Sequence, residues 1–307
     1  MDFALMTEPQ LGGTYEDLLA AARWAEQAGM VSFARSDHYY SGRDPRPEAT
    51  DAFVTLGGLA RETERIRLCV LVSPITFRHP AVIAKSAATL DQMSGGRLDL
   101  GVGTGWMDLE HEAFGIPFPD WAERFDRLEE ALGYLQAAFG PDPAGFSGAH
   151  YRLEAEVGPK PTGIRIVVGG TGPRRTPALA ARYADEYNHF IDTPEVIGPK
   201  LDVLRAAARE AGREPDSITV SVMGQVVTGR TEAEYRRVLE QGAVSRGLDP
   251  ETWAARLRGH GIPVGPAEAV RESLAALAGI GVDLFYLQWL DLAHLDGLAA
   301  TFEAIAG

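Results

Sequence analysis

The sequence predicts a single (β/α)8 barrel, and the order of its elements is the main reason. Eight short apolar runs alternate with longer segments of helical period along the 307 residues, and the last segment is helical. Eight such repeats ending in a helix fit a closed parallel barrel better than two open sheets. The length also suits one barrel of about 250 residues with insertions.

The predicted elements follow one another in regular order. The strand-like runs cover 3–6, 31–35, 66–72, 97–101, 164–168, 186–190, 218–223 and 284–288. Segments with apolar residues at helical spacing lie at 15–28, 80–93, 121–139, 178–184, 194–211, 267–279 and 292–306.

Two segments exceed the normal length of a connection and are interpreted as insertions. The first, 141–163, is rich in glycine and proline and follows the fourth barrel helix. The second, 229–266, follows the seventh strand and has helical patterns of its own at 232–241 and 250–258. Because loops after strands form the catalytic face of such a barrel, the second insertion is the better candidate for a substrate lid.

Composition excludes several classes of protein. The chain has 43 acidic and 29 basic residues and a formal charge of −14, which argues against nucleic-acid binding. Cys69 is the only cysteine, so no intramolecular disulfide forms and we expect a cytoplasmic setting. The N-terminus has no basic leader and the chain has no apolar run of about 18 residues, so we expect neither secretion nor a membrane span.

The first two of four unusual segments follow the second and third predicted strands. Residues 36–40, Ser-Asp-His-Tyr-Tyr, carry an acid, an imidazole and phenols that could transfer protons or bind a polar ring; alternatively, Asp37 caps a turn. Residues 72–80 are nearly apolar with two prolines and could form a rigid wall for a flat ligand. Pro80 also suits the first position of the next helix.

The third segment is Gly101-Val-Gly-Thr-Gly-Trp106, which superficially resembles a dinucleotide-binding turn. Residues 107–119 contain one glycine and two prolines, so we do not expect the helix that such a turn requires. Its glycines would still let a ligand approach the backbone, and Trp106 could stack on an aromatic ring.

The fourth segment, 169–177, places three glycines, Arg174 and Arg175 before a predicted helix. Backbone N–H groups at a helix N-terminus attract anions, so this segment predicts a phosphate site. A helix capped by Thr176 and started by Pro177 would account for those two residues only.

Other chemistries have less support. None of the seven histidines forms a pair with zinc-helix spacing, although Asp37, His38, Glu110 and His111 could meet at the barrel mouth. A metal hydrolase is therefore a distant alternative, and no metal site is predicted. Cys69 lies within a strand, where a small core residue is the ordinary interpretation.

A set of motifs closely resembles the bacterial luciferase-like monooxygenase family. They are Pro74-Ile-Thr-Phe-Arg-His-Pro80, Ala84-Lys85, Ala87-Ala-Thr-Leu-Asp91, Ser94-Gly-Gly-Arg97, Gly101 to Trp106 and Glu110-His111, with Ser36-Asp-His38 upstream and 124–130 and 169–175 downstream. The resemblance implies a TIM barrel that holds FMN or the deazaflavin coenzyme F420 in its mouth.

The resemblance also assigns roles to residues. Asp37-His38 resembles the F420 branch, where this pair contacts the coenzyme ring, and a non-prolyl cis peptide is expected near Leu71-Val72 behind that ring. An acid that donates a proton in the sugar-phosphate dehydrogenase branch is replaced by Trp106, so His38 or Glu110 must be the catalytic proton donor. The implied coenzyme-binding residues are Asp37, His38, Leu71, Val72, Ser73, Thr76, Gly103, Gly105, Trp106, Gly169, Gly170, Thr171, Gly172, Arg174 and Arg175.

The favoured activity is hydride transfer between F420 and a small organic substrate. One alternative is a monooxygenase that uses reduced FMN from a separate reductase, and another is a flavin-binding protein without turnover. Residues 114–118, 187–189 and the second insertion are expected to line a pocket for a moderately hydrophobic substrate. The resemblance implies a homodimer.

Overall fold

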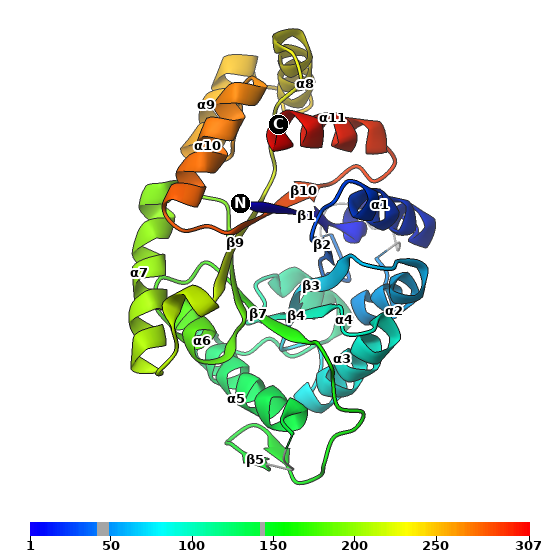
Figure 1. The fold of residues 1–307 in the computed structure, drawn as a ribbon, viewed down its shortest axis with the longest axis vertical. Helices are drawn as coiled ribbons and strands as arrows, with labels where there is room; N and C mark the ends of the chain where they lie inside the picture. Colours follow the sequence, from blue (N-terminus) through cyan, green and yellow to red (C-terminus); the bar gives the residue numbers. More distant parts are fainter. Residues whose placement is uncertain (42–48, 142–144) are drawn as a thin grey trace.

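The computed structural model describes residues 1–41, 49–141 and 145–307, and it confirms the barrel (Figure 1). Eight parallel strands close in the order β1-β10-β9-β8-β7-β4-β3-β2. They are β1 (Asp2–Thr7), β2 (Ser32–Arg35), β3 (Arg67–Pro74), β4 (Leu98–Gly103), β7 (Arg165–Gly169), β8 (Glu186–Phe190), β9 (Thr219–Gly224) and β10 (Leu284–Trp289). Every predicted strand is present with ends shifted by at most two residues.

Helices surround this barrel and bury their apolar faces against it. They are α1 (Tyr15–Gln27), α2 (Ala52–Glu62), α3 (Pro80–Ser94), α4 (Asp108–Phe114), α5 (Trp121–Phe139), α6 (Arg175–Tyr183), α7 (Pro194–Glu210), α10 (Ala267–Gly279) and α11 (Leu295–Ala306). Polar caps define several starts: the Asp120 side chain accepts from Glu123 N at α5, and Pro80 begins α3 as predicted. Among the described residues, no helix is both long and apolar enough to cross a membrane.

Two local predictions were wrong. A seven-residue helix, α4, occupies part of 107–119 and ends at Gly115, whose φ of +64° suits a left-handed helix end. Helix α6 begins at Arg175 rather than after Thr176, and its N-cap residue is Arg174, which makes no side-chain cap bond. Thr176 and Pro177 are therefore buried residues of the first turn and not the cap.

Both predicted insertions contain short elements. The first carries a two-stranded hairpin, β5 (Phe146–Ser147) and β6 (Arg152–Leu153), which lies against α5. The second forms α8 (Glu232–Val244) and α9 (Pro250–Gly259), which pack together on a small core of their own beside α10 and α11 (Figure 1). A lid function for this pair stays a prediction.

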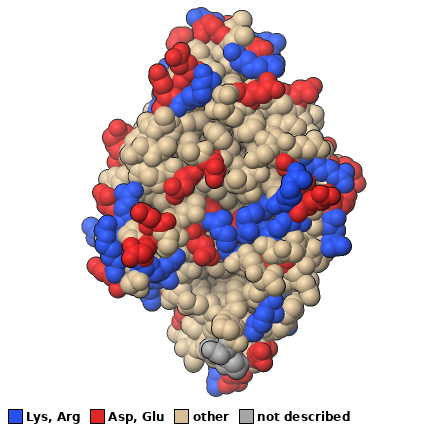
Figure 2. Space-filling view, in the orientation of Figure 1, with Lys and Arg blue, Asp and Glu red and all other residues tan. Residues whose placement is uncertain are grey.

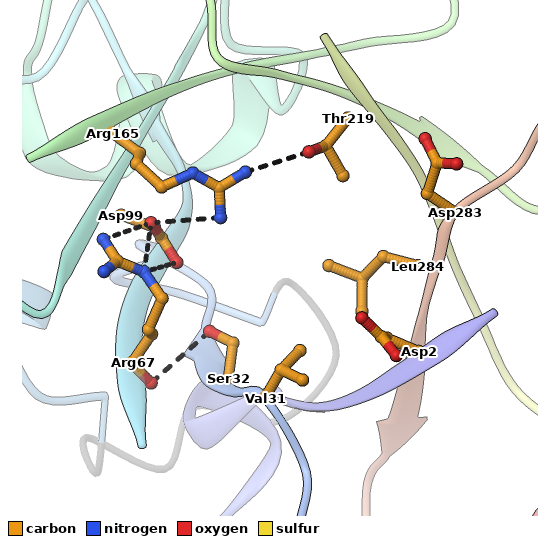
Figure 3. A pocket seen from close by; sticks show the side chains of 9 residues that line it. All are labelled: Asp2, Val31, Ser32, Arg67, Asp99, Arg165, Thr219, Asp283 and Leu284. Carbon is orange, nitrogen blue, oxygen red and sulfur yellow. Dashed lines mark hydrogen bonds and ion pairs between the residues drawn. The ribbon is translucent and has the colours of Figure 1, made fainter. Parts of the chain in front are cut away.

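The amino ends of the strands enclose a polar pocket of about 210 Å³ that Figure 3 shows from close by. Arg67 binds Asp99 there with its Nε at 2.9 Å and 3.1 Å from the two carboxylate oxygens, and Arg165 donates to Thr219. Above it the barrel interior is apolar apart from a few groups, including Glu186 and Tyr286. Cys69 is fully buried in this interior, as expected for a core residue.

Figure 2 shows a band of basic side chains that runs from the centre of the face in view toward the right, with acidic side chains beside it. A broad uncharged area lies above this band, and other basic and acidic side chains are mixed near the edges of the face. Many arginines of the chain are in ion pairs, such as Arg182 with Glu129 and Arg230 with Glu303. That the chain does not bind nucleic acid stays a prediction from its net charge.

Candidate functional site

The clearest candidate site lies where the carboxyl ends of the strands meet, and its centre is a histidine–glutamate pair. His38 follows β2, and Glu110 lies in α4, the short helix after β4. The His38 Nδ1 and Glu110 Oε1 atoms are 2.9 Å apart. Glu110 also accepts from the backbone N–H of Tyr39 at 3.1 Å through its other oxygen.

This contact changes the ionisation of the imidazole. Burial opposes the charged form of His38, but the hydrogen bond and the negative charge of Glu110 outweigh burial and raise the pKa of His38 above its ordinary value. Glu8 and Asp37 add to this effect. A histidine with a raised pKa is protonated over more of the neutral range, which suits a proton donor.

Asp37 lies beside His38 but faces the protein interior. Its carboxylate accepts from Ser73 Oγ at 2.7 Å and forms an ion pair with Arg78. The residue is only 2% exposed. Arg78 also pairs with Asp51, the N-cap residue of α2. Asp37 is therefore surrounded by protein partners and does not line the open part of the mouth.

Val72 projects into a space made by Gly101, Gly103 and Gly169. A β-bulge interrupts the pairing of β3 with β4 between Val70 and Ser73, and the Leu71-Val72 peptide is cis, as predicted. A Cβ atom at Gly103 or Gly169 would lie within 2.9 Å of a Val72 methyl group. These two glycines therefore accommodate Val72, whereas the sequence analysis assigned such glycines to close ligand approach.

The other predicted coenzyme-binding residues in and just after β3 lie either in the barrel interior or in the wall of the mouth. Leu71 is buried within the barrel, and Ser73 is committed to Asp37. Thr76 Oγ1 lies 2.6 Å from His111 Nε2, whose ring also bonds the Met107 carbonyl through Nδ1. His111 thus supports the wall and does not join His38. Among the described residues, no group of three or more His, Cys, Asp or Glu could hold a metal ion.

Aromatic side chains stand at the edge of the site with little cover. Trp106 is 65% exposed and meets the His38 ring edge-on, with ring centroids 5.6 Å apart. Phe114 is also exposed and stands edge-on to Tyr39, which itself stacks on Phe77. Exposed rings beside a titratable pair can supply an apolar contact surface for a ligand.

The predicted phosphate segment is partly exposed, and its Gly170 and Gly172 accommodate the Thr176 side chain. Gly170 has a φ of +148° and donates to the Asn188 carbonyl, while Thr171 is exposed. Arg174 and Arg175 are exposed as well, and Arg175 is 2.6 Å from Asp126. The structure therefore places this loop at the start of α6 as expected, with one of its two cations already paired.

A further cation at the mouth, Arg124, is not among the predicted site residues. Arg124 is buried between Phe118 and Trp121, at 3.7 Å and 4.6 Å from their ring centroids, and donates to the Gly105 carbonyl at 3.3 Å. Its Nε has no hydrogen-bond partner, and none of the ion pairs among the described residues involves it. A buried cation without a carboxylate can hold an anionic group.

Sequence analysis also missed Glu8, which follows β1. It is 8% exposed, accepts from Gln288 Nε2 at 2.9 Å and from Gln10 Nε2 at 2.6 Å, and acts electrostatically on His38. Its position directly after a predicted strand was the available signal, because strand ends carry the functional residues of such barrels.

Comparisons with known proteins agree with this fold. The luciferase-like monooxygenase family model matches residues 1–284, so the chain belongs to this family. Pyrimidine monooxygenase RutA of Yersinia enterocolitica is 28% identical over 242 residues, which cover 76% of this chain and 64% of that protein. An F420-dependent glucose-6-phosphate dehydrogenase of Kineococcus radiotolerans is 35% identical over 221 residues, which cover 70% of this chain and 60% of that protein.

These matches span less than two thirds of either relative. Among solved structures, an F420-dependent secondary alcohol dehydrogenase in complex with an F420–acetone adduct superposes with a TM-score of 0.80. The two chains are 20% identical, and the superposition covers 99% of this chain and 98% of that one. At this identity the similarity establishes the fold and leaves the reaction to be argued from the site.

Proposed function

We propose that this protein is an oxidoreductase that transfers hydride between coenzyme F420 and a small organic substrate. The observation that carries the proposal is the His38–Glu110 pair at the barrel mouth, 2.9 Å apart. Hydride transfer to a carbonyl, imine or alkene must be completed by a proton, and this pair can hold one near neutral pH. The coenzyme supplies the hydride when it is bound.

The residues at the mouth fit a flat, anionic coenzyme. Val72, which Gly103 and Gly169 accommodate, would give the ring an apolar surface. The partly exposed backbone of 171–172 and the buried Arg124, which has no carboxylate partner, would hold the phosphate. Arg174 adds an exposed cation, and Trp106 lies next to His38 at the edge of the mouth.

The pair defines what the protein does in the reaction. Glu110 bonds Nδ1 of His38, so Nε2 is the ring nitrogen left to exchange a proton with a substrate oxygen or nitrogen. Glu110 then stabilises the charged ring and keeps its orientation. The apolar rings of Trp106 and Phe114 would exclude water from the substrate and favour a moderately hydrophobic one.

A second candidate function is a monooxygenase that uses reduced FMN from a partner reductase. The match to RutA, a pyrimidine monooxygenase, supports it because that match covers 76% of this chain. F420 is favoured here because the F420-dependent relative has the higher identity, 35%. A flavin-binding protein without turnover is a third candidate, and the His38–Glu110 pair speaks against it.

The three candidates differ in what they consume. The purified chain would be mixed with reduced F420 and, separately, with reduced FMN, in the presence and absence of oxygen, against a panel of ketones, imines and alkenes. The proposal predicts oxidation of F420 that depends on an organic acceptor and not on oxygen. Formation of an oxygenated product with reduced FMN and oxygen, beyond the oxidation of reduced FMN that oxygen causes without protein, would support the monooxygenase. No turnover with either coenzyme would support a binding protein.

The expected cytoplasmic location and the homodimer remain predictions. Sedimentation velocity on the purified chain tests the dimer directly.

A further inference from the structure

We propose that Arg78 is a positioning residue that holds His38 against Glu110 by fixing the residues on both sides of it. Its catalytic meaning rests on the proposed function, but the positioning itself is a property of the chain alone. Arg78 lies in the connection between β3 and α3, so it reaches the loop after β2 from a neighbouring strand.

Arg78 makes an unusually complete set of contacts. Its guanidinium pairs with the Asp37 carboxylate through both Nη atoms, one of them at 3.1 Å from Oδ1, and donates to Ser73 Oγ at 3.2 Å. It also bonds the Tyr39 hydroxyl and Asp51. Its side chain is 10% exposed. Such a planar group with several fixed acceptors has one orientation.

Two of these contacts are with the residues on either side of His38 in the sequence. Asp37 is the residue before it and Tyr39 the residue after it, and Arg78 binds the side chains of both. The Tyr39 backbone N–H donates to the same Glu110 carboxylate that meets the His38 ring. One loop conformation therefore satisfies the Arg78 contacts and both Glu110 contacts together.

This arrangement gives Asp37 a different part from the ring contact that the resemblance implies. Its carboxylate is buried and its partners are Arg78 and Ser73. Asp37 serves as the anchor of Arg78. The aromatic rings of Phe53 and Tyr39, with centroids 4.9 Å and 5.4 Å from the guanidinium carbon, complete the enclosure of the cation.

The charge of Arg78 and its positioning of the loop have opposite effects on the pKa of His38, and this makes the inference testable. The groups that act on the His38 charge are Glu110, Glu8 and Asp37, which all favour the protonated ring. Removing the positive charge of Arg78 would by itself favour the protonated ring further. Losing the contact with Glu110 would instead lower the pKa of His38 toward the ordinary ~6.5.

The experiment measures the pKa of His38 by NMR in the full chain, with the resonance assigned from its loss in His38→Gln. Arg78→Lys keeps the charge and loses the planar fork, so we expect the pKa of His38 to fall. Tyr39→Phe removes a neutral hydroxyl, which accepts from Arg78 and donates to Asp51, and keeps the ring that stacks on Phe77, so a smaller fall is expected. Arg78→Ala should also lower the pKa of His38, although loss of the Arg78 charge would by itself raise it.

Arg67→Ala is the matched control, because Arg67 binds Asp99 in a similar two-oxygen contact at the opposite end of the barrel. It should leave the pKa of His38 unchanged. An unchanged or raised pKa of His38 in Arg78→Lys and Tyr39→Phe would overturn the inference. If the Arg78 variants do not fold, the result for Tyr39→Phe alone decides. Failure of the wild-type chain to bind either coenzyme would contradict the proposed function and leave this result standing.

Discussion

His38 Nδ1 and Glu110 Oε1 lie 2.9 Å apart although 72 residues separate them in the sequence. The contact joins the loop after β2 to the short helix after β4, and β3 lies between these strands in the barrel. Parallel closure brings the two strand ends to the same mouth. A single hydrogen bond thus defines the centre of the site.

Glu110→Gln tests what this bond does to the imidazole. The amide keeps the shape but loses the negative charge, so the pKa of His38 should fall toward its ordinary value. Because the raised pKa stabilises the folded state below the unfolded pKa of ~6.5 and this contribution is lost at higher pH, wild type should exceed the variant in stability mainly at acidic pH. NMR titration and urea unfolding at pH 5.5 and 8.5 measure both effects.

Glu112→Gln is the control for this substitution, since Glu112 lies in the same helix and is exposed. An unchanged pKa of His38 in Glu110→Gln would show that the contact has no electrostatic consequence.

Arg124→Met tests the buried cation beside the glycine loop. If its charge holds the coenzyme phosphate, the dissociation constant of the coenzyme should rise about tenfold to a hundredfold, the equivalent of ~1.5–3 kcal/mol for a charged hydrogen bond. Fluorescence titration measures the affinity. Arg127→Met on the same helix removes an arginine already paired with Glu123 at 2.6 Å and should have no effect. Equal affinities for Arg124→Met and wild type would remove Arg124 from the site.

The fold was largely predictable because its signal is repeated. Eight apolar runs bounded by helices leave few alternatives, and small shifts of strand ends do not change the topology. The errors at α4 and α6 concern short segments, where one glycine or one cap decides the boundary. Helix α2 is not among the predicted segments, although Asp51 caps it.

The site was predictable only in part. Position after a strand identifies His38 and Glu110 as residues of the mouth, but their hydrogen bond depends on the loop conformation. The Asp37 carboxylate is held by an ion pair with Arg78, which follows another strand. Nothing in the sequence around Asp37 indicates this pair. Likewise, Gly103 and Gly169 are glycines because Val72 packs against them. The spacing of residues in the sequence does not reveal that these three residues are neighbours in space.

Gly101→Ala tests the space around Val72. The new Cβ would meet the Val70 carbonyl oxygen and lie 2.8 Å from Val72 Cγ1. Because the backbone oxygen cannot easily move, we expect a loss of about 1–3 kcal/mol in the free energy of unfolding, measured by urea titration. Gly198→Ala in α7 has no atom within 4 Å of its new Cβ and should gain up to about 1 kcal/mol. Equal effects of the two substitutions would contradict this explanation of the glycines.

Glu186→Gln tests a buried acid of the barrel interior. Burial and the nearby Asp99 raise the pKa of Glu186 from 4.5 to about 7, and its Oε2 has no hydrogen-bond partner. The folded protein therefore holds a proton that the unfolded chain releases, so wild type loses stability as pH rises from about 4.5 to about 7. Above pH 7 the glutamine variant should be the more stable by on the order of 3 kcal/mol, at ~1.4 kcal/mol per pH unit.

Urea unfolding of Glu186→Gln at pH 4.5 and pH 8 checks this difference, which should nearly vanish at the lower pH. Glu240→Gln, an exposed residue of α8, should show no pH-dependent difference from wild type. A glutamine variant that is less stable than wild type at pH 8 would show that the ion pair with Arg165, 3.7 Å away, outweighs the burial of the charge.

The most direct test of the account is an anaerobic binding titration of the purified chain with oxidised F420 and with FMN, followed by coenzyme fluorescence. The account predicts saturable binding of F420 that is at least tenfold tighter than binding of FMN, and weaker F420 binding in Arg124→Met. Tight, saturable binding of FMN together with no detectable binding of F420 would contradict it.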